Sequence, residues 1–178
     1  GEHTIDYAKP FERIAYGTLF ENAVGIPMAD EEAVRAKASE LHIETAATRD
    51  HWLLVGDLFE QLVEKTIDAS CPTFVTDFPS AISPLTRPHA DNPVLSHRWE
   101  LFIAGMEIAN AYTELNDPDL QLQRFTEQLD GEDEEAAAFR TLDEEFIHAL
   151  RVGMPPAGGL GLGIDRLVML LTGNESIR

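Results

Sequence analysis

The sequence predicts an α+β fold, in which helices and antiparallel strands occupy separate stretches of the chain. Three observations support this class: two helical patterns within residues 31–68, a hairpin pattern over 98–115, and a glycine-rich strand followed by a helix over 159–171. Segregated helices and hairpin-connected strands are typical of α+β proteins. The 178 residues, 44% of them hydrophobic, are enough for one domain with a hydrophobic core.

Two helices are predicted within residues 31–68. Asp30 is the expected N-cap of the first, in which Glu31 and Arg35 have the favourable i,i+4 order. Asp50 is the expected N-cap of the second, over residues 51–68. Each helix has one apolar face, formed in the first by Val34, Ala38 and Leu41 and in the second by Trp52, Val55, Phe59, Leu62, Val63 and Ile67.

The rest of the chain alternates strands, a long loop and further helices. β-Branched and aromatic residues predict a strand over 73–78, and the prolines of 79–93 predict a long loop of the kind that often binds ligands. Residues 98–115 carry the strongest strand pattern, with a hairpin turn at Ala104-Gly105. Helices are predicted over 119–128 and 134–152. The final helix, from Asp165, is expected to bury its apolar side chains, Leu167, Val168, Leu170 and Leu171.

The charge balance argues against two classes of partner. The chain has 32 acidic and 13 basic residues, a formal net charge of −19. A self-sufficient nucleic-acid binder needs clustered Lys and Arg, and an anionic membrane surface needs the same. The longest uninterrupted apolar run, residues 167–171, is far too short to span a bilayer. The single cysteine, Cys71, excludes an internal disulfide and predicts a reducing, cytoplasmic location.

Two acidic residues of the hairpin form the first candidate site. With the turn at Ala104-Gly105, Glu100 and Glu107 lie within about two register steps on adjacent strands. Two carboxylates together with phosphate oxygens are a common way to hold Mg²⁺. The alternative is that these acids belong to the solvent-facing side of a half-exposed hairpin.

The glycine-rich segment 158–166 forms the second candidate site. Glycines at 159, 161 and 163 let a ligand approach the backbone closely, and the helix that follows offers its N-terminus to an anion. Arg166, in the first turn of that helix, has the fork geometry for a phosphate. The segment lacks the context of a dinucleotide-binding fingerprint. A turn that serves only packing is the alternative.

Taken together, these segments resemble the class II lysyl-tRNA synthetases over nearly the whole chain. The matching stretches are residues 83–85, 98–118, 123–125, 153–156 and 159–169. The last stretch, GLGLGIDRLVM, is similar to motif 3 of the class. Its Ile164-Asp165-Arg166 triplet resembles the lysine enzymes, because the aspartate and asparagine enzymes usually have Glu before that Arg. The resemblance implies part of a class II antiparallel sheet flanked by helices, with residues 31–68 as a helical insertion.

The resemblance also implies a nucleotide site. Glu100 and Glu107 resemble the carboxylates that hold Mg²⁺ on the ATP phosphates. Arg166 resembles the catalytic motif 3 arginine on the γ-phosphate, and Gly161 and Gly163 lie in the nucleotide-binding part of the same motif. The implied cofactor is therefore Mg²⁺, with ATP as a substrate.

Three further residues of the second hairpin strand are implied to bind lysine. Asn110 resembles the amide near the lysine carboxylate, Tyr112 resembles an aromatic wall of the pocket, and Glu114 resembles the acid that pairs with the ε-ammonium. A buried carboxylate is a natural selector for a cation on an aliphatic stem. The implied function is activation of lysine with ATP and charging of tRNA with lysine.

The chain departs from the family pattern in what it leaves out. It carries no Phe-Arg-x-Glu signature of motif 2, and we find neither motif 1 nor an anticodon-binding barrel. We therefore expect residues 1–178 to be the C-terminal part of the catalytic domain of a homodimeric parent, nearly inactive alone. Two alternatives stay open: a related enzyme that transfers lysine to an elongation factor or a membrane lipid, and a non-catalytic remnant that binds a ligand.

Overall fold

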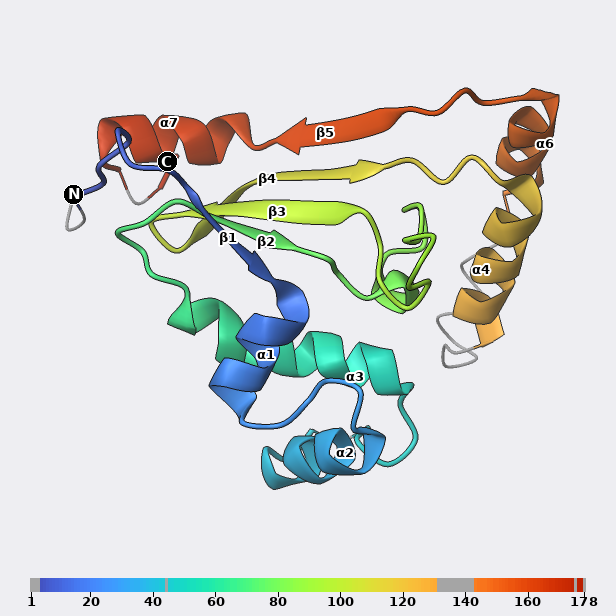
Figure 1. Cartoon of the computed structure of the whole chain (residues 1–178), viewed down its shortest axis with the longest axis horizontal. Helices are drawn as coiled ribbons and strands as arrows, with labels where there is room; N and C mark the ends of the chain where they lie inside the picture. Colours follow the sequence, from blue (N-terminus) through green and yellow to red (C-terminus); the bar gives the residue numbers. More distant parts are fainter. Residues whose placement is uncertain (1–3, 44, 131–142, 175, 178) are drawn as a thin grey trace.

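A five-stranded sheet forms the centre of the computed structural model, which describes residues 4–43, 45–130, 143–174 and 176–177 (Figure 1). The strands lie in chain order across the sheet: β1 (Glu12–Ala15), β2 (Thr73–Thr76), β3 (Arg98–Ile103), β4 (Met106–Thr113) and β5 (Gly158–Leu162). Strands β2 to β5 pair antiparallel, which confirms the α+β class and the hairpin. The first strand, which the sequence analysis did not predict, pairs parallel to β2.

Helices cover one face of the sheet at its β1–β3 side (Figure 1). They are α1 (Tyr16–Val24), α2 (Glu31–Glu40) and α3 (His51–Leu58), which continues as a π-helical turn η1 (Phe59–Val63) and a 3₁₀ turn η2 (Glu64–Thr66). Their apolar residues form the main core with Val75 and Phe102 of the sheet. The helices of residues 31–68 are therefore an integral part of this core. Whether they are an insertion stays a prediction.

The helix starts follow the predicted capping. The Asp30 carboxylate accepts a hydrogen bond from Ala33 N (3.1 Å), and that of Asp50 accepts from Trp52 N (2.8 Å) and Leu53 N (3.3 Å). Side-chain oxygens at this position satisfy backbone N–H groups that have no partner within the helix. The hairpin turn is confirmed as well, because Ala104 and Gly105 both have positive φ, 52° and 74°, as a two-residue type I′ turn requires.

The predicted loop after β2 contains a short helical turn and is joined to other segments by isolated β-bridges. It contains a 3₁₀ turn, η3 (Ser80–Ile82), and three isolated bridges pair Pro79 with Leu95, Thr86 with Glu114, and Pro88 with Ser96. Helix α4 (Pro118–Asp130), capped by Asp117, packs against α6 (Glu144–Val152). The predicted helix over 134–152 is confirmed from residue 144. Residues 134–142 lie outside the described part of the chain.

Helix α7 (Ile164–Thr172) corrects one expectation. It begins where β5 ends, as the strand–helix prediction for 159–171 requires, but none of its residues is buried. Val168 is 48% and Leu171 75% exposed, and Leu167 and Leu170 are only half-buried. The physical reason is position: β5 is the last strand, so α7 packs against β4 at the edge of the sheet. Among the described residues, no helix is long and apolar enough to cross a membrane.

Candidate active site on the helix-covered face of the sheet

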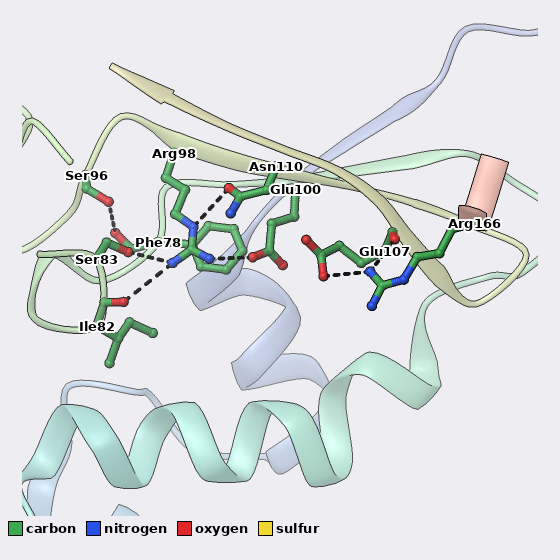
Figure 2. A network of polar contacts seen from close by, with 9 residues as sticks. All are labelled: Phe78, Ile82, Ser83, Ser96, Arg98, Glu100, Glu107, Asn110 and Arg166. Atoms are coloured by element: carbon green, nitrogen blue, oxygen red, sulfur yellow. Dashed lines mark hydrogen bonds and ion pairs between the residues drawn. The ribbon is translucent and has the colours of Figure 1, made fainter. Parts of the chain in front are cut away.

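A β-bulge in the hairpin brings the two acidic residues to one face. Glu100 pairs with Asn110, whereas Glu107 pairs with Phe102 because the register shifts between Leu101 and Phe102. Residues 107 and 110 are three apart, so a regular strand would place their side chains on opposite faces. The bulge reverses the alternation and aims Glu107 to the same face as Glu100 and Asn110, which is the face that carries the core helices (Figure 2).

Arg98 forms hydrogen bonds with several polar residues on this face. Its Nη2 donates to Glu100 Oε1 (2.6 Å), and its Nε donates to Asn110 Oδ1 (3.3 Å) (Figure 2). The guanidinium lies over the Phe78 ring, 4.6 Å from the centroid, and Nη1 donates to Ser83 Oγ (2.9 Å). Arg98 is a residue of this site that was not predicted from the sequence. Its signal is the i,i+2 spacing from Glu100, which places both side chains on one face of a strand.

The second acid is paired with the arginine of helix α7. Arg166 Nη1 donates to Glu107 Oε2 (3.1 Å) and to the Glu107 backbone oxygen (2.6 Å) (Figure 2). The N–H of Gly163 donates to Ile108 O (2.9 Å), which fixes the start of α7 beside the bulge. Residues 59 positions apart in the sequence thus meet in the candidate site.

Burial and like charge act together on the acids. Glu100 lies on an inner strand with a side chain only 12% exposed, so the solvent-facing interpretation of this residue is wrong. Burial raises the pKa of Glu100 to about 7; Arg98 opposes this rise, and Glu107 adds to it. The pKa of Glu64, on the adjacent turn η2, is raised by burial and by the charges of Glu60 and Glu107. A cation placed between these carboxylates would relieve their repulsion.

The carboxylates of Glu100 and Glu107 suit a hard cation whose remaining ligands are water and phosphate oxygens. Among the described residues, no group of three or more His, Cys, Asp or Glu side chains is arranged to hold a metal. Mg²⁺ in nucleotide sites uses one or two carboxylates and takes its other ligands from water and phosphate. Glu100 and Glu107, which interact electrostatically, fit that requirement.

The edge strand β5 leaves the same face free of side chains. Gly161 pairs with Asn110 and Gly159 with Tyr112, so these glycines lie beside the polar residues of β4, whereas Leu160 and Leu162 alternate to the other face. An added Cβ at Gly159 would overlap Glu114 Oε1. Glycine at 159 therefore leaves room for the Glu114 carboxylate, which would have to move if a Cβ were added.

Glu114 stands apart from the other acids. Its backbone is fixed, because its N–H donates to Ala157 O (3.0 Å) and the residue forms an isolated bridge with Thr86. Within the described part of the chain its carboxylate has no ion-pair partner. The structure thus brings together Glu100, Glu107, Asn110 and Arg166. It places Tyr112 further along β4 on the same face, and Glu114 just beyond the end of the strand on the same side. A cavity of about 430 Å³ is lined by Thr76, Trp99 and Ala111 of the opposite face and also by Arg98, Tyr112 and Gly159.

Comparisons with known proteins agree on one family. The family model described as tRNA synthetases class II (D, K and N) matches residues 1–178. The chain is 45% identical over 185 residues to the lysine–tRNA ligase of Aquifex aeolicus and 42% identical over 180 residues to that of Porphyromonas gingivalis, and both matches cover 100% of the chain. It is 44% identical to the ligase of Carboxydothermus hydrogenoformans over 98% of its length. The chain spans only 30%, 31% and 36% of these relatives, about a third of each.

Proposed function

Because the chain belongs to the class II tRNA synthetases that comprise the D, K and N members, we propose that it supplies part of the active site of a lysine–tRNA ligase. The reaction is activation of lysine with ATP, followed by transfer of lysine to tRNA. One observation carries the choice of amino acid: the Glu114 carboxylate, without an ion-pair partner among the described residues, lies over Gly159 at the end of a row of polar side chains. A lone carboxylate in that position selects a substrate that ends in a cation.

The row of polar side chains at positions 110, 112 and 114 matches the polarity of lysine. Asn110 faces the amino-acid carboxylate, Tyr112 borders the aliphatic stem, and Glu114 pairs with the ε-ammonium. Asn110 and Tyr112 point to one face of β4, and Glu114, one residue beyond the end of the strand, points to the same side, where it meets Gly159. Residues two apart in an extended segment are about 7 Å apart. Aspartate and asparagine carry no side-chain cation for Glu114.

The nucleotide lies at the other end of the row. Glu100 and Glu107 would hold Mg²⁺, which neutralises charge on the ATP phosphates when it is bound. Arg166 leaves Glu107 and forks onto the γ-phosphate, and the bare backbone at Gly161 and Gly163 leaves room for the nucleotide. These groups position the ATP phosphates and neutralise their charge but do not react themselves, as is usual in phosphoryl and nucleotidyl transfer.

The chemical step follows from that arrangement. A carboxylate oxygen of lysine attacks the α-phosphorus of ATP, the bond from the α-phosphorus to the bridging oxygen breaks, and pyrophosphate leaves. The product is lysyl-adenylate, from which the lysyl group passes to tRNA. Asn110 orients the attacking carboxylate, and Arg166 stabilises the charge that develops on the leaving pyrophosphate.

The partners and location belong to the same proposal. They are ATP, lysine and tRNA, a second copy of the parent enzyme, and the cytoplasm, for which the single cysteine is the supporting feature. Exposed apolar side chains of Leu160, Ile164 and Leu171 give the β5–α7 edge a surface suited to further protein.

A hybrid enzyme tests the proposal. The stretch of the Aquifex aeolicus ligase that matches this chain is replaced by the chain itself, and exchange of pyrophosphate into ATP is measured with lysine, aspartate or asparagine. We expect exchange with lysine alone. The 178-residue chain by itself should be nearly inactive, because it has no motif 2 arginine and one lost charge contact costs about 3 kcal/mol of transition-state stabilisation. Exchange with aspartate or asparagine, or no binding of lysine, would overturn the proposal.

A further inference from the structure

We propose that Arg98 is a positioning residue that orients the amide of Asn110 toward the carboxylate of the amino-acid substrate. This inference rests on the proposed function and concerns how the same site recognises its substrate. Arg98 acts through Asn110 and does not itself contact the substrate. Its hydrogen bond to the Asn110 amide determines whether the amide oxygen or the amide nitrogen faces the ligand.

The guanidinium is shared among partners on three sides. Nε donates to Asn110 Oδ1 (3.3 Å), Nη2 to Glu100 Oε1 (2.6 Å), and Nη1 to Ser83 Oγ (2.9 Å) and Ile82 O (3.5 Å). All three nitrogens are therefore engaged, and the plane of the group is set by these bonds. A lysine at this position would offer a single ammonium, which cannot reach all these partners in the same fork geometry.

The contact with Nε settles the orientation of the Asn110 side chain. Nε of arginine is a donor and never an acceptor, so the atom that faces it must be the amide oxygen. With Oδ1 occupied, Nδ2 is left as the outward-facing group, and it has no hydrogen-bond acceptor among the described residues. Two N–H bonds presented in this way suit a carboxylate and repel an ammonium group.

Arg98 contacts a ring and a loop, and the loop is in turn hydrogen-bonded to helix α4. The Phe78 ring lies under the guanidinium, and Ser83, 2% exposed, receives one of its bonds. The loop that carries Ser83 is tied to α4, because Arg124 Nη1 donates to Ser80 O (2.6 Å) and Gln121 Nε2 to Pro84 O (3.1 Å). A guanidinium fixed from behind can hold the amide in one orientation without help from the ligand.

The test compares lysine with a ligand that lacks the carboxylate. Equilibrium binding of L-lysine and of 1,5-diaminopentane is measured for the hybrid ligase and for its Arg98→Lys, Asn110→Ala and double variants. Arg98→Lys should weaken lysine binding on the order of 10- to 100-fold, the range of a hydrogen bond to a charged group. Binding of 1,5-diaminopentane should change less than about twofold, and the double variant should bind lysine no more weakly than Asn110→Ala.

A matched control separates positioning from general damage to the sheet. Arg13 lies over the Phe74 ring (5.7 Å) on β1 of the same sheet, and Arg13→Lys should leave both ligands unaffected. Equal loss of both ligands in Arg98→Lys, or additive losses in the double variant, would refute the positioning role. If the unmodified hybrid does not bind lysine, the proposed function fails instead.

A second measurement needs no ligand. In the 178-residue chain, the side-chain amide of Asn110 should be rigid by ¹⁵N relaxation and should become mobile in Arg98→Gln but not in Arg13→Gln. Unchanged rigidity in Arg98→Gln would contradict the inference.

Discussion

Replacement of Glu100 by glutamine should remove a pH dependence from the stability of the chain. The carboxyl is buried, and its pKa rises from the usual 4.5 to about 7. In the folded chain it therefore keeps a proton that the unfolded chain has already lost between these two values. The stability that this group contributes is fully present below pH 4.5 and is lost as the pH rises through 7. The difference corresponds to about 3 kcal/mol.

Urea unfolding of the wild-type chain and of Glu100→Gln at intervals from pH 4 to pH 8 measures this effect. The variant also leaves Arg98 without its carboxylate partner, but Arg98 stays charged throughout, so this adds an offset that does not depend on pH. The free energy of unfolding of the variant minus that of the wild type should increase by about 3 kcal/mol from pH 4 to pH 8. Glu12→Gln, at an exposed position on β1, is the matched control. Parallel pH profiles for wild type and Glu100→Gln would show that folding does not raise the pKa of Glu100.

The remaining predictions concern the acid pair, the glycine strand and helix α7. In the hybrid ligase, Glu100→Gln and Glu107→Gln should each slow lysine adenylation on the order of 100-fold across a Mg²⁺ titration, and the double variant should be little worse; multiplicative losses would separate the two acids. Gly159→Ala should raise the KM for lysine and not for ATP, because the added Cβ overlaps Glu114; an unchanged lysine KM would contradict that contact. Leu171→Ser should change the free energy of unfolding by less than about 0.5 kcal/mol, since the side chain is exposed; a loss above 2 kcal/mol would show that it is buried.

Local chemistry made the elements predictable where one residue decides the backbone. Asp30 and Asp50 cap the helices that the sequence predicts, and Ala104-Gly105 forms the predicted turn. Candidate residues on the hairpin were predictable too, since carboxylates on adjacent strands lie close whenever the turn is known. The face on which they lie was not predictable, because a one-residue bulge beside Glu107 inverts the alternation without a sequence signal of its own.

Features that depend on distant parts of the chain could not be predicted. Strand β1 forms only because it pairs with β2, about 60 residues further on, and its short pattern does not distinguish it from a turn. The apolar side chains of α7 look like core residues in the sequence, but the helix lies at the edge of the sheet and buries none of them. The position of Arg98 depends on Ser83, in a loop without periodicity, and on the ring of Phe78, whose predicted strand pattern does not indicate a contact with a guanidinium.

Replacement of Glu114 by glutamine tests whether this residue selects lysine by its charge. The change keeps the shape of the side chain and removes the charge that meets the ε-ammonium. Loss of one partner of a buried charge pair costs about 3–5 kcal/mol, so in the hybrid ligase the KM for lysine should rise by at least about 100-fold. The KM for ATP should stay within about twofold of the unmodified hybrid. An unchanged KM for lysine together with a raised KM for ATP would assign Glu114 to the nucleotide and contradict the account.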